Sequence, residues 1–497
     1  MKLPGVLSAA MIGAALLAPP PAAALIGVDM PVSKIYGTAK TVAVGTVAGL
    51  SAENRVIDVK VGRWLKGPPA GDRIRVQIAT PAALFKDVSK GEPVVLFVGE
   101  AKGGAVGVLH LADTWLLARP IPRRKLRAWR TVQVYEGRRS FPGRTVALAR
   151  LVHQLKLGKA TLLDRVRHVA FRRAARPLAK LKVAKPSFLL APDVNSDGKP
   201  DLLVGTARGV RLLLASGGSF QDVTAAWGLV GPGGSCGTFA DIDGDGKVDL
   251  LVGRTLWRND GRRFADVNAR LDVPRDSRSL ATALVDVTGD GKPDAVVLLT
   301  DGRLLTFKSP TRRGEAWTRQ AVRKLWKDDR AVLAAAFGKW GDDGKPHVVV
   351  VRADGMTRYA LAASGGPPAD FAGLTGEGAE AYRRAFRNGP GRVSATSIDA
   401  NGDRRPDLFV LGESGRLLLV NRGFGAYLVS PDASRAAAAR AGTGFPFGLA
   451  SRALCAAADL HGDGFDDLLL LTEDGRLYEV SNPPSPASRP SRRAGRP

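Results

Sequence analysis

The chain has few cysteine and histidine residues, two and five among 497. Cys236 and Cys455 are too few for a disulfide scaffold, even in an exported protein. A bridge needs Cα atoms within about 7 Å, and the two lie in nonadjacent segments, so we expect free, buried thiols. The histidines are scattered, and no nucleophile or metal-hydrolase motif accompanies them. These absences weigh against zinc sites and the common hydrolase classes.

Long apolar runs are absent beyond the N-terminus. Residues 1–24 contain Lys2, an apolar stretch at 6–18 and three alanines at 22–24, which is the pattern of a cleaved signal peptide. A membrane anchor is the weaker alternative, because the prolines at 19–21 end the run short of the roughly 18 residues that a span needs. We therefore expect no transmembrane segment in the mature chain and a secreted or periplasmic, extracytoplasmic location.

Acidic residues are outnumbered, 47 against 73 Lys and Arg, which gives a net charge of +26. The excess is concentrated in residues 119–185, where 20 Lys or Arg accompany only Glu136 and Asp164. Such a segment could bind an anionic surface polymer, such as a glycan, lipid headgroups or nucleic acid, in a salt-dependent way. The alternative is a solvated helix face, which the arginines scattered elsewhere favour. No nucleic-acid-binding motif supports the polymer hypothesis.

The acidic residues that are present recur in the spacing DxDxDGxxD. Five copies occur, DVNSDGKPD from Asp193, DIDGDGKVD from Asp241, DVTGDGKPD from Asp286, DANGDRRPD from Asp399 and DLHGDGFDD from Asp459. A degenerate sixth copy, KWGDDGKPH, begins at Lys339. Successive copies start 48, 45, 53, 60 and 60 residues apart, which predicts a repeat architecture.

The residues around each loop repeat as well. A short run rich in Val, Leu and Phe lies on either side, as in GTFA and DLLVG around the second loop, and a turn then leads to a third run. Such units predict three- or four-stranded antiparallel meanders, which stack radially into a β-propeller. Six loops over residues 186–482 predict six blades, with seven as the alternative. Residues 181–185 are expected to supply the outer strand of the last blade.

The second repeat, FADIDGDGKVDLLVGRTLWRNDGRRFADV, resembles the FG-GAP or VCBS-type repeat of integrin-like propellers and secreted bacterial proteins. Loop, glycine, strand and trailing aromatic match in order, and the resemblance covers roughly residues 186–482. It implies a β-propeller that acts in binding or adhesion. Trp227, Trp257 and Phe264 lie where this family has a blade-end aromatic, so we expect them to pack between blades rather than to stack on a sugar.

The loop chemistry suits Ca²⁺, which takes six to eight oxygen ligands. Oxygens at positions 1, 3, 5 and 9, with the carbonyl of position 7, can converge, and glycine at position 6 permits the sharp turn. A solvated Asp-Gly turn is the alternative for any single copy. An EF-hand is excluded, because its position 12 would be Val204 or Val252. The candidate ligands, for three to five Ca²⁺ sites, are Asp193, Asn195, Asp197, Lys199 and Asp201; Asp241, Asp243, Asp245, Lys247 and Asp249; Asp286, Thr288, Asp290, Lys292 and Asp294; Asp399, Asn401, Asp403 and Asp407; Asp459, Asp463 and Asp467.

The copies differ in quality. The second has the full carboxylate set, whereas Thr288 is a weaker ligand, Arg404 replaces the turn glycine and His461 suits Ca²⁺ poorly. The degenerate copy has Lys339, Gly341 and His347 at ligand positions, so we expect no metal there.

Residues 27–118 alternate apolar and polar residues in short runs, which predicts a β-rich domain that weakly resembles an OB-like barrel. Residues 119–185 are predicted to be a basic, partly helical connector, with an apolar helical stripe from Leu148 to Leu155 and a second helix from Thr161. Residues 483–497 are predicted to be a disordered tail. The repeat array and the signal-peptide pattern, with the role that the family resemblance implies, favour an exported Ca²⁺-binding scaffold or adhesion module for a protein or glycan; a secreted carbohydrate-active enzyme is the alternative.

Overall fold

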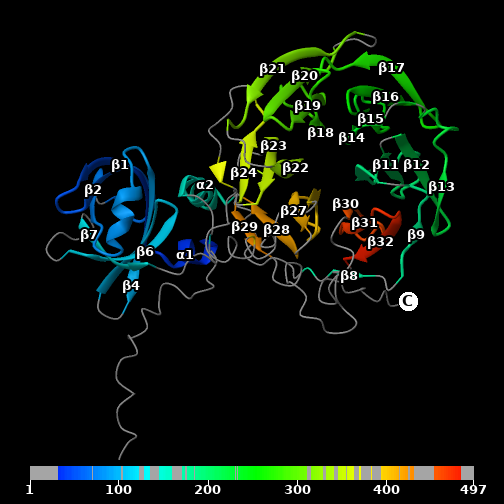
Figure 1. Cartoon of the computed structure of the whole chain (residues 1–497). Coiled ribbons are helices and arrows are strands. Elements are labelled where there is room, and N and C mark those ends of the chain that lie inside the picture. Colours follow the sequence, from blue (N-terminus) through cyan, green and yellow to red (C-terminus); the bar gives the residue numbers. More distant parts are fainter. Residues whose placement is uncertain are drawn as a thin grey trace, which may run out of the picture. The chain divides into compact units, whose positions relative to one another are not determined.

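The chain divides into two compact units, residues 1–164 and 165–497, and Figure 1 labels many of their elements. The signal peptide expected at 1–24, the tail at 483–497 and the helix expected from Thr161 lie outside the residues that this computed structural model describes. Among the described residues, no helix has the length and apolar character to cross a membrane. The described residues are 32–482 without 70, 102–103, 122–127, 135–140, 142–144, 159–168, 170, 174–175, 184, 207, 230, 232, 311–314, 328–331, 341–344, 354, 363–368, 371–381, 383–392, 413–414, 424–425 and 430–452.

The first unit is built on a closed barrel with the strand order β1-β2-β3-β7-β6-β5-β4. Its strands are β1 (Thr41–Ser51), β2 (Val56–Lys66), β3 (Arg73–Gln77), β4 (Pro93–Ala101), β5 (Gly104–Leu111), β6 (Thr114–Pro120) and β7 (Ala128–Val134). Alternate apolar residues such as Ile57 and Val59 point into the core, which Trp129 also fills. The short helices are α1 (Val32–Thr38) and the 3₁₀ turn η1 (Ala82–Asp87).

The barrel has seven strands, two more than an OB-like barrel. Its extra closing strand β7 lies within residues 119–185, the predicted connector. β7 pairs with β3 in parallel, Arg75 opposite Ala128, whereas the other pairings are antiparallel. That parallel pair joins residues about fifty positions apart, and it extends the barrel beyond residue 118.

Helix α2 (Thr145–Lys156) confirms the helical stripe, because Leu148, Leu151 and Val152 are buried. At its first residue the Thr145 N–H donates to Asp113 Oδ1 at 2.7 Å, and the Thr145 hydroxyl lies 2.8 Å from Nδ1 of buried His110. Burial lowers the pKa of His110 to about 3, so this imidazole is neutral in the folded unit.

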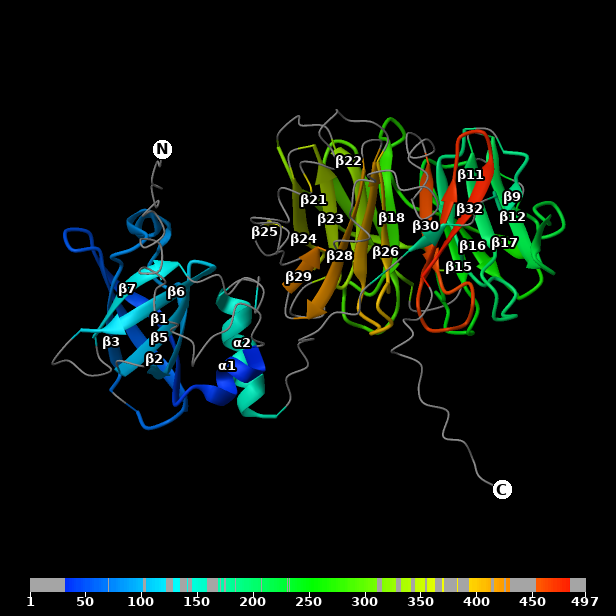
Figure 2. The same ribbon diagram turned by 90° about the horizontal axis from the view of Figure 1, so that it is seen from below.

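The second unit is a six-bladed β-propeller, as predicted, with six sheets arranged radially (Figure 1). Figure 2 shows their strands running between the two faces of the ring. Blade 1 contains β10 (Phe188–Leu190), β11 (Leu202–Thr206), β12 (Gly209–Ser216) and β13 (Ser219–Asp222); blade 2, β14 (Gly237–Ala240), β15 (Asp249–Val252), β16 (Thr255–Asn259) and β17 (Phe264–Arg270); blade 3, β18 (Ser279–Val285), β19 (Asp294–Leu299), β20 (Arg303–Lys308) and β21 (Thr318–Lys324). Blade 4 contains β22 (Val332–Gly338), β23 (His347–Arg352), β24 (Met356–Ala360) and β25 (Ala369–Asp370); blade 5, β26 (Ser394–Ile398), β27 (Asp407–Gly412), β28 (Gly415–Gly423) and β29 (Ala426–Val429); blade 6, β30 (Leu454–Ala458), β31 (Asp467–Leu471) and β32 (Arg476–Ser481).

Residues ahead of blade 1 complete blade 6 and so close the ring. β8 (Arg172–Arg173) and β9 (Ala179–Lys180) both pair with β32. The predicted closing strand at 181–185 is therefore wrong in position, although its first residue still donates its N–H to the Gly475 carbonyl at 2.8 Å. β8 and β9 already occupy the edge of β32 with which a strand at 181–185 was expected to pair.

The second strand of each blade is buried on both faces, because neighbouring blades cover it from both sides. In β19, Val297 packs toward blade 2, whereas Val296 and Leu298 pack against Val348 and Val350 of blade 4. This arrangement explains why these strands are continuous apolar runs rather than alternating ones.

Candidate metal sites in the acidic loops

Each acidic loop joins the first and second strands of its blade, and its first aspartate organises the backbone. In blade 2, Asp241 accepts hydrogen bonds from the N–H groups of Gly244 (2.7 Å), Asp245 (3.1 Å) and Gly246 (2.9 Å). Gly246 has φ +82°, which explains the glycine at position 6. The first aspartates of the other acidic loops likewise accept from positions 5 and 6; these are Asp193, Asp286, Asp399 and Asp459.

The ninth-position aspartate ties the loop to the sheet. Asp249 Oδ2 accepts the Ile242 N–H at 2.9 Å, and its Oδ1 accepts the Asn259 N–H at 2.8 Å. The ninth-position carboxylates of the other loops accept the same two hydrogen bonds. One comes from the N–H of loop position 2, and the other comes from an N–H near or just beyond the end of the third strand. These carboxylates are Asp201, Asp294, Asp407 and Asp467. All five are at most 2% exposed. This role is structural and does not depend on a metal.

Burial has an electrostatic consequence for these carboxylates. It raises the pKa of Asp249 to about 6, although two backbone N–H groups oppose the shift. Burial also raises the pKa of Asp201 and of Asp407. A nearby cation would favour the charged forms again.

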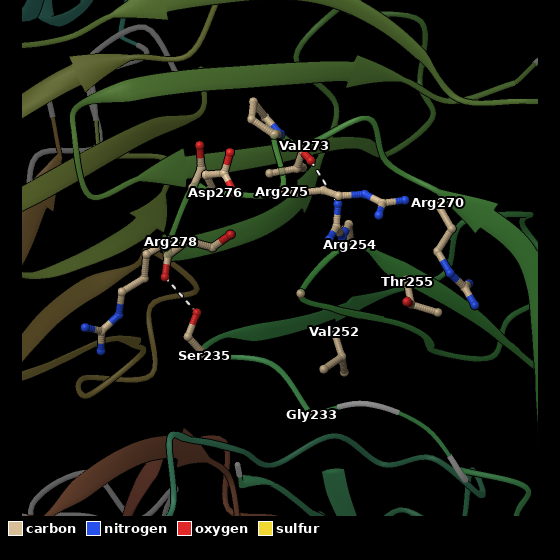
Figure 3. A pocket seen from close by; sticks show the side chains of 14 residues that line it. Gly233, Ser235, Val252, Arg254, Thr255, Arg270, Val273, Arg275, Asp276 and Arg278 are labelled. Carbon is tan, nitrogen blue, oxygen red and sulfur yellow. Dashed lines mark hydrogen bonds between the residues drawn. The ribbon is translucent and has the colours of Figure 1, made fainter. Parts of the chain in front are cut away.

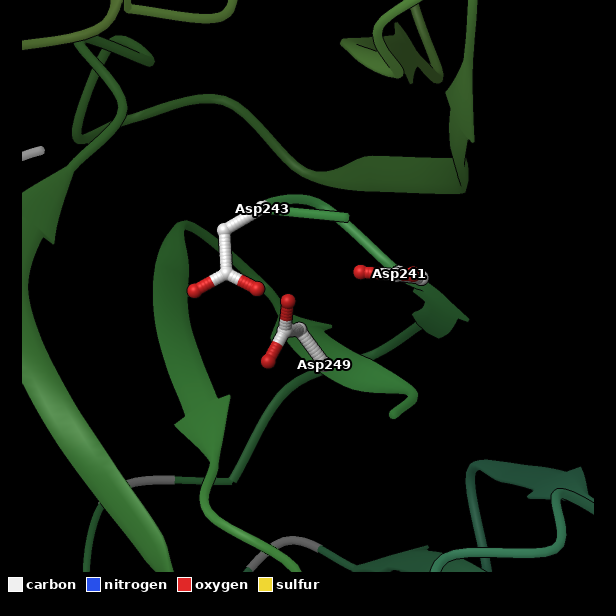
Figure 4. A group of neighbouring side chains, drawn as sticks. All are labelled: Asp241, Asp243 and Asp249. Carbon is white, nitrogen blue, oxygen red and sulfur yellow. The ribbon is translucent and has the colours of Figure 1, made fainter. Parts of the chain in front are cut away.

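In blade 2 three carboxylates converge: ligand oxygens of Asp241, Asp243 and Asp249 all lie within 4.8 Å of one another (Figure 4). Two oxygens bound to one Ca²⁺ at 2.3 to 2.6 Å can be at most about 5 Å apart, so the spacing fits this ion. The triad could therefore bind a metal ion. Elsewhere in the described part of the chain, no three Asp, Glu, His or Cys side chains meet the same spacing.

Two basic side chains lie beside this triad. Arg258 contacts Asp243 and also Asp245, with 3.4 Å between Nη2 and Oδ2, and Lys247 Nζ lies 3.0 Å from Asp245 Oδ2. Slight burial raises the pKa of Asp245, but the hydrogen bonds from Lys247 and the charge of Arg258 outweigh it, so the pKa is lowered overall. Asp245, predicted as a ligand, thus pairs with the protein's own cations in this structure.

The first, third and fifth loops keep the same backbone but bring fewer carboxylates together. The amides of Asn195 and Asn401 donate to Asp197 (3.2 Å) and Asp403 (3.1 Å). In the third loop Asp290 pairs with Lys308 at 3.1 Å. The N–H groups of the position-7 lysines, whose carbonyls are predicted ligands, donate to the position-5 carboxylates; these are Lys199, Lys247 and Lys292.

The fifth and sixth loops carry the departures noted in the sequence. Arg404 adopts φ +63°, which glycine takes more readily, and its N–H still donates to Asp399. In the sixth loop the His461 Nδ1 lies 2.9 Å from Asp467 Oδ2 and Nε2 lies 3.4 Å from Glu479. The imidazole thus contacts the carboxylate that would otherwise face a metal.

The degenerate loop of blade 4 uses different chemistry. The buried His347 replaces the ninth aspartate, and its Nδ1 lies 2.7 Å from the Lys345 carbonyl. The Trp340 carbonyl accepts hydrogen bonds from Arg358 and from the Tyr427 hydroxyl, each at 2.8 Å. Lys339 lies just ahead of this contact, and residue 341 lies outside the described residues.

Sequence reasoning missed the residues that tie neighbouring blades together. Asn259 Nδ2 donates to the Val194 carbonyl of blade 1 at 2.8 Å, and Asn482 Nδ2 donates to the Ala400 carbonyl of blade 5 at 2.7 Å. Asp466 accepts the Asp399 N–H across the same seam at 2.7 Å. The sequence feature that could have identified these asparagines is their recurrence at or just beyond the end of the third strand, in LWRND and EVSN.

Two further predictions are confirmed. Cys236 and Cys455 are free and buried. The blade-end aromatics are also buried, Trp227 lying 5.9 Å from Phe264 between ring centroids, so they pack rather than present a sugar-stacking surface.

Residues 193–252, which span the first two acidic loops, match the FG-GAP-like repeat. The chain resembles a Photorhabdus luminescens Tc holotoxin pore at TM-score 0.41 and 16% identity, covering 80% of this chain but only 17% of that one. An Agrocybe aegerita lectin that recognises non-reducing terminal N-acetylglucosamine has TM-score 0.39 and 17% identity, covering 60% and 81%. BBS1N in complex with ARL6DN has TM-score 0.36 and 12% identity, covering 64% and 98%. No curated protein matches the sequence.

Proposed function

We propose that this propeller, which contains an FG-GAP-like repeat, is an exported, Ca²⁺-binding module that recognises a protein or glycan. The observation that carries the metal assignment is the convergence of Asp241, Asp243 and Asp249 within 4.8 Å. Three carboxylates at that spacing repel one another, and a hard divalent cation with oxygen ligands offsets the repulsion.

The number of ions follows from the oxygen sets of the loops. The loops from Asp193, Asp241 and Asp286 each offer four side-chain oxygen ligands, which gives three sites. If the loops from Asp399 and Asp459 also bind Ca²⁺, the number of sites is as many as five. In these sites the first aspartate would bind through oxygens that also hold the loop backbone. The bound cation would supply charge neutralisation, while the ninth aspartate keeps the loop on its sheet.

Export and partner choice rest on other features. The signal-peptide pattern at 1–24 supports an extracytoplasmic location, where free Ca²⁺ is abundant enough for weak sites to fill. The basic segment 119–185 is a second proposed contact, for an anionic surface polymer, because its arginines and lysines outnumber its acids tenfold.

The test of the metal assignment is calorimetric titration of Ca²⁺ into the full chain after EDTA treatment and desalting. The variant Asp243→Ala should lose one site, because it removes one of the three converging carboxylates and leaves no oxygen in its place. The matched control Asp72→Ala removes an exposed barrel carboxylate and should keep every site. Absence of bound Ca²⁺ in the unmodified chain at millimolar concentration would refute the proposal.

A further inference from the structure

A cavity of about 520 Å³ lies at the seam between blades 2 and 3. Its walls come from the β15–β16 turn, the end of β17, the link from β17 to β18 and the segment that leads into β14. The acidic loop of blade 2 joins β14 to β15, and successive turns of an antiparallel meander lie at alternate ends of the sheet. The cavity therefore opens on the face opposite to the acidic loops.

The charged groups lining this cavity are four arginines and a single carboxylate (Figure 3). They are Arg254, Arg270, Arg275, Arg278 and Asp276. This excess of positive charge contrasts with the acidic loops at the other end of the same blade.

Two of the arginines have defined partners. Arg270 forms a bidentate pair with Asp266, at 2.8 and 2.6 Å, and so contributes little free charge. Arg254 is half-buried and donates from Nη1 to the Val273 carbonyl at 3.0 Å, which orients its guanidinium, and among the described residues no carboxylate pairs with it. The backbone carbonyl therefore holds a cation in place at the cavity wall.

The other two arginines are exposed, and among the described residues neither Arg275 nor Arg278 forms an ion pair. The nearby Arg303 is already paired with Asp301 at 2.7 Å and donates to the Ser277 hydroxyl at 2.7 Å. Asp276 alone cannot neutralise the guanidinium groups of this wall. The cavity thus keeps unpaired donors that match planar oxyanions.

The rest of the lining is small and polar. Hydroxyl groups come from Ser235, Thr255, Ser277 and Ser279, and the Ser235 hydroxyl donates to the Ser279 carbonyl across the seam at 2.8 Å. None of the described residues that line the cavity is aromatic. Its volume is within the usual range for small-ligand sites, and hydroxyls interspersed with arginines suit a ligand that itself carries both hydroxyl and acidic groups.

We propose that this cavity binds an acidic saccharide. Its carboxylate or sulfate is held by Arg254, Arg275 and Arg278, and its hydroxyl groups contact the serine side chains of the cavity wall. This inference deepens the proposed binding function by naming a ligand class, and it rests on that function. The carboxylate of a uronic acid and the sulfate of a sulfated sugar share the same recognition chemistry, and the experiment separates them.

The experiment measures binding by the full chain at fixed, millimolar Ca²⁺. The probes are a galacturonate tetrasaccharide, a heparin-derived tetrasaccharide, a neutral maltotetraose and inorganic phosphate. The double variant Arg275→Ala/Arg278→Ala should weaken binding of the preferred acidic tetrasaccharide about tenfold or more, since hydrogen bonds to charged groups are lost. The matched control Arg262→Ala/Arg263→Ala removes two exposed arginines from the β16–β17 turn of the other face and should change affinity less than about twofold.

The outcomes separate clearly. Preference for the galacturonate or the heparin tetrasaccharide, lost only in the cavity variant, supports the proposal and identifies the oxyanion. Equal losses in both double variants would show nonspecific attraction and overturn it, as would binding of maltotetraose alone, of phosphate alone or of none of the probes. Because Ca²⁺ occupancy is measured separately, failure here leaves the metal assignment standing, and failure of the metal assignment leaves this result interpretable.

Discussion

The barrel and the propeller close their rings in different ways. In the barrel, strand pairing itself closes the structure, through the parallel β3–β7 pair and the β4–β1 pair. In the described part of the propeller no hydrogen-bonded ladder runs between the six sheets, so the seams depend on apolar packing and on hydrogen bonds such as that from Asn259 to Val194. The acidic loops and the asparagines thus stabilise the unit that lacks continuous strand pairing.

Blade 4 is the internal exception. It keeps four strands although His347 replaces the ninth aspartate, and its loop is anchored by Arg358 and Tyr427 at the Trp340 carbonyl. A blade therefore does not require carboxylates to fold. It requires some partner for the backbone groups of its loop, because buried N–H and carbonyl groups are costly when unpaired.

Calcium removal should produce the largest contrast between the two units. At a Ca²⁺ concentration one hundred times the dissociation constant, each site stabilises the folded state by about 2.7 kcal/mol, so EDTA should lower the unfolding temperature of the propeller. Hydrogen–deuterium exchange resolved by peptide should speed up in blade 2 and stay unchanged in β5 and β6. Equal changes in both units would break the comparison.

Asp249→Ala should destabilise blade 2 even in EDTA. The change leaves the N–H groups of Ile242 and Asn259 without their acceptor, and buried unpaired groups cost about 1 to 3 kcal/mol each. We expect a loss of about 3 kcal/mol in urea unfolding. The paired control Asp243→Ala, which removes a proposed metal ligand without structural bonds to the backbone, should cost less than about 1 kcal/mol in EDTA. Similar losses would mean that the ninth aspartate has no special role.

Asn259→Ala tests the seam between blades 1 and 2. The side-chain amide donates to Val194 and Val248, and its oxygen accepts the Gly261 N–H at 2.8 Å. Its loss should cost about 2 kcal/mol, with or without Ca²⁺, by the same desolvation argument. Asn195→Ala, which removes only solvent-exposed hydrogen bonds with Asp197, should be neutral in EDTA. Urea midpoints of the two variants measure the difference, and an unchanged midpoint for Asn259→Ala would argue against polar ties at the seams.

His110 gives the smallest effect, and it is confined to the barrel. Its pKa is lowered to about 3 by burial, against about 6.5 in an unfolded chain. The unfolded state therefore binds the extra proton between those values, so stability is lost as the pH falls below 6.5. We expect the barrel to lose about 1 kcal/mol between pH 7 and pH 5.5. NMR resonances of β5 and β6 during urea unfolding would report it, and His110→Gln should remove the dependence.

The fold of the propeller could be predicted from the sequence, because the residues that define each repeat lie close together in the chain. The first aspartate of each loop bonds to N–H groups four and five residues ahead, and the apolar run that follows is the next strand. The spacing therefore predicted the loops, the blades and the convergence of Asp241, Asp243 and Asp249. The barrel was harder, because β3 meets β7 only through a pairing that no local pattern marks.

The sequence by itself determined the repeat and the spacing of the acidic loops, since both depend on residue types at fixed, short separations. Only the tertiary structure decided which residues close the ring at β8 and β9, which asparagines join the blades, and that arginines from separate turns gather at one seam. The physical reason is that these features arise from contacts between segments far apart in the chain, whose meeting depends on how the sheets pack.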